Sequence, residues 1–207
     1  MNLLSPLLLS ISSNLDTFTI GTSYGIKKIR MTKSSLLIIS IITSIGTFVS
    51  MYIGVLIANF FNQNISNIFG SILLSLIGIY FIIEHVRIEK KHRGEDVSYY
   101  VENALKYKKI LEESNIIDTS KSYDIYIREI FLLSFALTIN NISAGVAASI
   151  TGINIPISTF FNFIATIISF YLGYFIGNSY FFKLFNKYTT LASGIILIVL
   201  GMYEAFI

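Results

Sequence analysis

Long hydrophobic runs separated by short polar stretches dominate the chain. An α-helix rises 1.5 Å per residue, so crossing a hydrocarbon layer about 30 Å thick takes about 20 helical residues with few charges. This pattern predicts an all-α polytopic membrane protein with six transmembrane helices. The predicted spans run approximately over Leu3 to Ile26, Ser34 to Phe61, Ile68 to Val86, Glu129 to Thr151, Ile155 to Tyr180 and Thr189 to Phe206.

Composition supports a lipid environment and narrows the chemistry. The chain is 54% hydrophobic and 13% charged, which is more apolar than soluble domains of this length. It contains no cysteine, so disulfides and thiolate metal sites are excluded. The first apolar run, Leu3 to Ile11, has the length of a signal-peptide core, but no Lys or Arg precedes it and no small-residue cleavage site follows. We therefore expect it to be retained in the first span.

The basic residues predict the orientation of the spans. If the N-terminus lies outside, all 15 Lys and Arg residues fall in cytoplasmic segments, as the positive-inside rule requires. Both termini are then outside a bacterial cell membrane, and residues 87–128 form a cytoplasmic loop between the two halves, 1–86 and 129–207. The positive charge is explained by this topology, and we expect no nucleic-acid partner.

The two halves of the chain share sequence. The segment Asn14 to Gly21 aligns with Thr138 to Gly145, which pairs Asp16 with Asn140, each five residues before a glycine. Because three crossings change the side of the membrane, the halves are predicted to be inverted three-helix repeats. Two further matches occur in the same order: Ser50 to Gly54 with Ser169 to Gly173, and Gly78 to Tyr80 with Gly201 to Tyr203.

Asp16 is the only acidic residue deep inside a predicted span, where an ionised carboxylate costs about 2.5 to 3.5 kcal/mol or more. Asn14, Asn140 and Asn141 offer amide oxygens, and an all-oxygen shell suits hard divalent cations such as Mg²⁺, Ca²⁺ or Mn²⁺. Asn14 lies about 200° around a helix from Asp16, so both face one site only if the helix is broken or the site surrounds it. The alternative is that Asp16 is protonated or bonded to Asn140 and joins two helices.

Small residues predict where helices pack closely. Gly21 and Gly25 are four residues apart, as are Gly145 and Ser149 in the second half, which lets backbones approach. Two other acidic residues, Glu84 and Glu204, lie near helix ends, where we expect solvent contact, snorkelling or capping.

The stretches Leu15 to Arg30 and Asn140 to Gly152 resemble the manganese efflux pump family, and more closely its sporulation branch, the YtaF membrane proteins, which also have a longer central loop. The resemblance implies two three-helix repeats, with an acidic motif in helices one and four, and Mn²⁺ as the transported ion. By position, the first acid falls on Asp16 and the second on Asn140, which is an amide.

Two functions are compatible with these features. The first is a divalent-cation transporter with its site at Asp16, completed by neutral oxygens of Asn140 and Asn141. The second is a non-transporting sporulation membrane protein that binds a protein partner through its cytoplasmic loop. Neither a Walker A motif nor a nucleophile and base pair is present, so we expect no enzyme activity and no cofactor. The expected partners are the lipid bilayer and a small cation.

Overall fold

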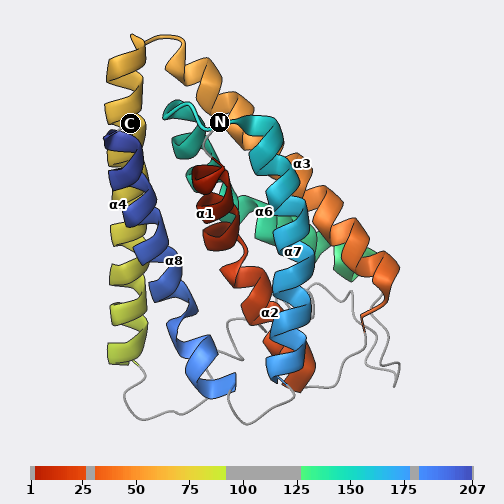
Figure 1. Cartoon of the computed structure of the whole chain (residues 1–207). Coiled ribbons are helices and arrows are strands. Elements are labelled where there is room, and N and C mark those ends of the chain that lie inside the picture. The colour runs from red at the N-terminus through yellow and green to blue at the C-terminus, as the bar shows by residue number, and fades with distance from the viewer. Residues whose placement is uncertain (1–2, 27–30, 92–126, 178–181, 207) are drawn as a thin grey trace.

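The computed structural model describes residues 3–26, 31–91, 127–177 and 182–206, and this part of the chain is helical (Figure 1). The side chains of residues 88–91, 127–129, 140 and 182–187 are not described. The helices are α1 (Leu4–Ser13), α2 (Leu15–Ile26), α3 (Lys33–Ala58), α4 (Gln63–Lys91), α6 (Ile127–Ile150), α7 (Ile155–Gly177) and α8 (Phe182–Ala205).

Four helices are long and apolar enough to cross a membrane: α3, α4 as far as Arg87, α7, and α8 from Tyr188. Helix α6 makes a fifth if its two parts, which are bent by 43° between Ile139 and Asn141, form one span. The predicted first span is divided at Asn14 into α1 and α2, of 10 and 12 residues. At 1.5 Å per residue each part is too short to cross alone. The structure therefore establishes four to five candidate spans, and a sixth is part of the proposal below.

The observed bounds agree with the predicted spans to within a few residues, with two differences. Helix α4 starts at Gln63 and continues to Lys91, so the start of the predicted cytoplasmic loop 87–128 is helical. Helix α8 starts at Phe182, seven residues before the predicted position. Residues 92–126, which hold most of that loop and the segment expected to bind a protein partner, lie outside the described residues.

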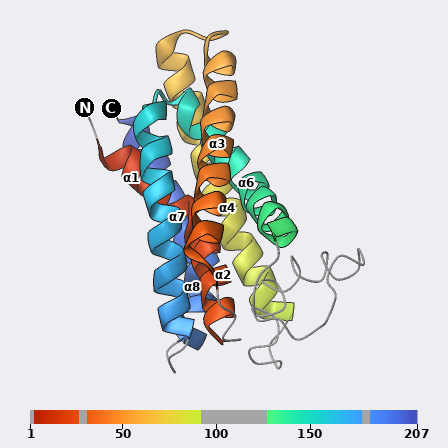
Figure 2. The ribbon, with the colours of Figure 1, turned by 90° about the vertical axis from the view of Figure 1, so that its right-hand side faces the viewer.

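The helices pack in reciprocal pairs. Helix α2 packs against α7, α6 packs against α3, and α4 packs against α8 (Figures 1 and 2). Both termini lie at one end of the bundle, together with the turn between α3 and α4 and the turn between α6 and α7. The last turn of α2 and the start of α8 lie at the opposite end.

Glycines allow the backbones of paired helices to touch. A Cβ atom on Gly21 would lie 2.5 Å from the Phe170 carbonyl oxygen, and one on Gly173 would overlap the Phe18 carbonyl. In the other pair, a Cβ on Gly145 would overlap the Ser50 hydroxyl. Close approach of this kind replaces side-chain interdigitation in membrane helix packing. Further overlaps of this type include Gly25 with Tyr174, Gly177 with Thr22, and Gly54 with Val146 and Ser149.

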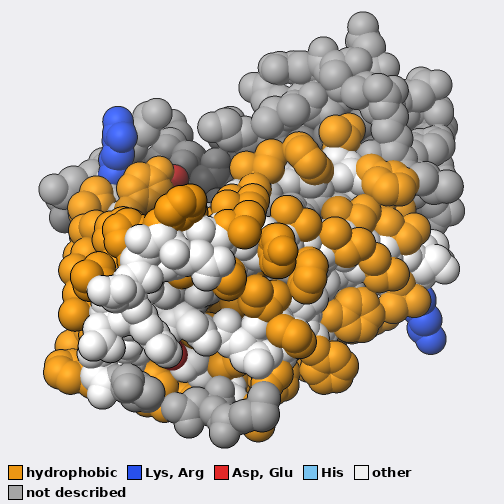
Figure 3. Space-filling view, turned by 90° about the horizontal axis from the view of Figure 1, so that it is seen from above, with side chains coloured by type: hydrophobic (Ala, Val, Ile, Leu, Met, Phe, Trp, Pro, Cys, Tyr) orange, Lys and Arg blue, Asp and Glu red, His pale blue; other side chains and the backbone are white. Residues whose placement is uncertain are grey.

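Hydrophobic side chains face outward as well as inward. Ile45, Phe135 and Phe175 are 57%, 62% and 78% exposed, as expected for lipid contact and not for a water-soluble surface. Seen from the end that carries both termini, the molecule shows a patch of polar side chains and backbone bordered by hydrophobic residues (Figure 3).

Two buried hydrophobic clusters lie on either side of Asn14 along the first helical segment. One contains Leu9 from α1, and the other contains Ile20 from α2. The residues between them carry the polar groups described next. The first cluster also includes Met51, Leu74, Leu197 and Leu200, and the second includes Leu36, Ile39, Leu137 and Phe170.

Candidate functional site

The helix break at Asn14 is held by that residue's own side chain. Asn14 adopts φ −103° and ψ 6°, outside the helical region, and is 1% exposed. Its Nδ2 donates to the Ser10 carbonyl at 2.8 Å and to Oδ1 of Asn162 in α7 at 2.8 Å. Its Oδ1 accepts from the Thr166 hydroxyl at 2.7 Å. A side-chain amide has two N–H donors and an oxygen acceptor with two lone pairs. It can therefore form hydrogen bonds with several polar groups around a helix break at once.

A buried polar network extends from Asn14 through α7 to α3. Thr166 is fully buried, and its single hydroxyl proton is shared between Oδ1 of Asn14 and the Asn162 carbonyl, which lies 2.8 Å away. The same hydroxyl lies 3.3 Å from that of Thr43 in α3. The Nδ2 of Asn162 is buried and makes no hydrogen bond within the described residues. Buried polar groups are nearly always satisfied, so this N–H donor is one that a water or an anionic oxygen would bind.

Helix α8 contacts the same segment through hydroxyl pairs. The hydroxyls of Ser12 and Ser193 lie 2.9 Å apart, and those of Thr19 and Thr189 lie 3.1 Å apart. Asp16 lies between these pairs along the chain and is partly buried. It occupies the first turn of α2, where the partial positive charge of a helix N-terminus stabilises a carboxylate. The break thus places Asp16 at a helix N-terminus in the middle of the predicted first span.

The second half carries its own break. Helix α6 bends at Asn140, the residue that aligns with Asp16. The neighbouring Asn141 is buried, with 9% exposure. Helix α6 contacts α1. The side chain of Asn140 lies outside the described part of the chain, so its position relative to Asp16 stays a prediction.

No group of three or more His, Cys, Asp or Glu side chains is placed to hold a metal among the described residues. A cation bound near Asp16 would therefore be held by one carboxylate with amide, hydroxyl and carbonyl oxygens. This donor set carries a single charge, and fewer charged ligands bind a cation more weakly.

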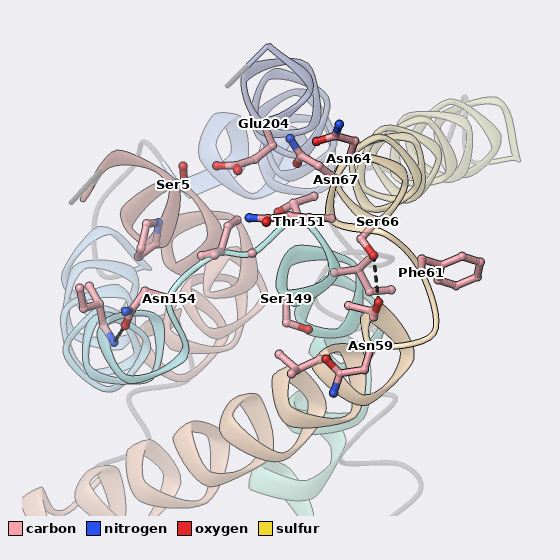
Figure 4. Close-up of a pocket in the computed structure, with 18 residues that line it drawn as sticks. Ser5, Asn59, Phe61, Asn64, Ser66, Asn67, Ser149, Thr151, Asn154 and Glu204 are labelled. Carbon is pink, nitrogen blue, oxygen red and sulfur yellow. Dashed lines mark hydrogen bonds between the residues drawn. The ribbon is translucent and has the colours of Figure 1, made fainter.

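The sequence did not indicate the roles of Asn162, Thr166 and Thr43. Asn162 and Thr166 are four residues apart in an otherwise apolar helix, so they share a face, and this spacing was the available signal. Glu204 is more buried than its position near a helix end predicts. It is 8% exposed, and its carboxylate points toward Ser5 at a pocket between the helix ends (Figure 4). Helix α1, from the other end of the chain, packs against α8 beside it.

Comparison with known proteins identifies the family. Residues 63–203 match the family described as "Putative manganese efflux pump". The chain is 29% identical over 157 residues to the "Probable sporulation protein YtaF" of Bacillus subtilis (strain 168), covering 73% of this chain and 75% of that protein. It is 32% identical over 83 residues to a "Putative manganese efflux pump MntP" of Clostridium perfringens (strain SM101 / Type A), covering 40% of this chain and 38% of that protein. No solved structure matches. With more than half of its length matched, this multi-pass bacterial membrane protein belongs to the manganese efflux pump family.

Proposed function

We propose that this chain transports divalent cations, with Mn²⁺ as the transported ion and Asp16 as the charged group at the centre of the pathway. The observation that carries the proposal is the break at Asn14, which places Asp16 in the first turn of a half-helix. Discontinuous helices near the bilayer midplane are how many secondary transporters build ion sites, because their ends supply both dipoles and free backbone oxygens. The family of the chain supports the choice of ion.

The proposed topology has six spans in two inverted repeats, 1–86 and 129–207, with both termini outside. Both termini lie at one end of the bundle, which an even number of crossings produces. The glycine contacts support the relation between the repeats. Gly21 contacts Phe170, and Gly145, which aligns with Gly21, contacts Ser50. The residue that follows Ser50 aligns with Phe170, so the two contacts are equivalent. The same holds between α4 and α8. There, a Cβ on Gly78 would meet the Gly194 carbonyl, and one on Gly201 would meet the Ser71 carbonyl.

In the proposed mechanism, Asp16 attracts the cation and neutral oxygens from Asn140 and Asn141 complete its shell. Asn14 is assigned a different role from the one its amide first suggested, because its side chain is used to hold the break against α7. Relative movement of the two repeats then exposes the site to each side of the membrane in turn. The driving force would be an ion gradient or a separate subunit.

The test is the Mn²⁺ content of cells that express the wild type or Asp16→Asn at matched membrane abundance. We expect the wild type to lower cell Mn²⁺ and Asp16→Asn to lose that effect. Glu84→Gln is the matched control, because it removes the same charge from α4, away from the break. If Asp16→Asn exports as well as the wild type, Asp16 is not in the pathway. If the wild type does not change cell Mn²⁺, manganese efflux is refuted.

The amide at position 140 favours a second candidate, a sporulation membrane protein that acts by binding a partner. The relative of Bacillus subtilis that shares 29% identity carries a sporulation name, and the helix-four acid implied by the resemblance is absent here. Deleting residues 99–121 separates the two candidates. A transporter should keep most of its flux, whereas a docking protein should still insert but fail in sporulation. Restoring the acid with Asn140→Asp should increase Mn²⁺ export only if the transporter proposal holds.

A further inference from the structure

A pocket of about 680 Å³ opens at the end of the bundle that carries both termini (Figure 4). It is formed by the start of α1, the turn between α3 and α4, the turn between α6 and α7, and the end of α8. It is therefore separate from the break at Asn14. Its polar lining is made of neutral oxygen-bearing side chains, including Asn59, Asn64, Asn67, Thr151 and Asn154.

Glu204 is the exception in this neutral lining. Among the described residues of the pocket wall it is the only charged side chain, and no Lys, Arg or His lines the pocket with it. It is 8% exposed. A carboxylate removed from water needs compensation by a cation or by several donors. In this pocket the described wall supplies no cationic side chain for that purpose.

Two oxygens of the pocket wall, one of them beside this carboxylate, have unused capacity. Ser5 is 2% exposed, and its hydroxyl lies next to the Glu204 carboxylate without completing a hydrogen bond of good geometry. The Oδ1 of Asn67 is buried and has no hydrogen-bond partner among the described residues. An amide oxygen without a donor is an acceptor available to a cation, and a hydroxyl can turn its lone pairs to the same ion. Carboxylate, amide and hydroxyl oxygens together are the ligands of hard divalent cations.

We propose that this pocket is a second divalent-cation site, in which Glu204 supplies the charge and Asn67 and Ser5 supply neutral oxygens, with water completing the shell. It deepens the proposed function, since a site at this end of the bundle would hold the ion where it enters or leaves the pathway. Binding at the pocket does not itself require transport, so the two can fail independently.

The experiment measures Mn²⁺ binding to the purified full chain in detergent by electron paramagnetic resonance, which reports loss of the free-ion signal. The background is Asp16→Asn, so that the proposed midspan site does not contribute. In that background we expect one Mn²⁺ per chain, and adding Glu204→Gln should weaken its binding at least about tenfold, because affinity follows the number of charged ligands. Glu84→Gln in the same background is the control and should bind like its parent.

A variant that is expected to bind Mn²⁺ more tightly separates loss of binding from loss of folding. Asn67→Asp adds a second carboxylate to the wall of the pocket that Glu204 lines, and we expect it to tighten Mn²⁺ binding at least about tenfold. The proposal is overturned if the Asp16→Asn chain binds no Mn²⁺, or if Glu204→Gln binds as its parent does. It is also overturned if Asn67→Asp leaves the affinity unchanged. Failure of Asp16→Asn cells to export Mn²⁺ bears only on the proposed function and leaves this binding result intact.

Discussion

Replacing Asn14 by Ala should destabilise the protein by more than its size suggests. The substitution removes three hydrogen bonds of 2.7 to 2.8 Å, to the Ser10 carbonyl, to Asn162 and from Thr166. In membrane proteins such bonds contribute about 0.6 kcal/mol each on average. Leaving the Asn162 amide without partners costs more than one lost hydrogen bond. Its Nδ2 already has no partner among the described residues, and its Oδ1 would lose its hydrogen bond from Asn14. An unsatisfied buried polar group costs about 1 to 3 kcal/mol.

Together, the lost hydrogen bonds and the unsatisfied Asn162 amide predict a loss of about 2 to 4 kcal/mol, after allowing about 0.6 kcal/mol for the better helix propensity of Ala. The assay is unfolding in mixed detergent micelles with SDS, followed by far-ultraviolet circular dichroism. Asn64→Ala is the control, because Asn64 carries the same side chain in an exposed position of α4.

A double-mutant cycle tests whether the two amides are coupled. Because Asn14 and Asn162 share a hydrogen bond, Asn14→Ala with Asn162→Ala should cost at least about 1 kcal/mol less than the sum of the single changes. Strict additivity would refute the network. So would a loss below about 0.5 kcal/mol for Asn14→Ala alone, since the break would then be held by something other than this side chain.

Two further predictions use the glycines and the absence of cysteine. Gly21→Ala should cost more than about 2 kcal/mol in the same unfolding assay, since its Cβ would meet the Phe170 backbone. Gly152→Ala should cost about 1 to 2 kcal/mol, because Gly152 has φ 87° with open space around it. Equal losses of stability for the two variants would contradict this ranking. In the natural cysteine-free background, a membrane-impermeant maleimide should label Asn62→Cys from outside intact cells but not Ser34→Cys, and labelling of Ser34→Cys alone would reverse the proposed orientation.

The hydrophobic pattern was sufficient to predict most helices. The predicted spans beginning at Ser34 and Glu129 start within two residues of α3 and α6, because a run of about 20 apolar residues has one structural solution in a bilayer. The break at Asn14 was not predicted as such. The sequence indicated only that Asn14 and Asp16 could not share a face of an unbroken helix. A single Asn in an apolar run does not by itself show whether the helix is broken or continuous there.

The polar partners could not be predicted from the sequence for a different reason. Asn14 and Asn162 are 148 positions apart, and their contact depends on how α7 packs against the first helical segment. The burial of Glu204 was not predicted, because a position near a helix end predicts contact with water and the packing of α1 beside Glu204 is not visible in the sequence. Pairing across the bundle is a tertiary property, so residues that meet in this way are visible only in the structure.

The glycine contacts between α2 and α7 also determine how these helices can move. On each helix two glycines face the backbone of the other, and beside them Tyr24 of α2 packs edge-on against Phe170 of α7. Helices joined by interdigitated leucines must lift one side chain over another to shift along their axes. A surface of bare backbone presents smaller steps, so at the glycines we expect less resistance to a shift along the axes than large side chains would give. The same residues that bring the helices close thus leave translation along the interface less hindered than it would be between large side chains.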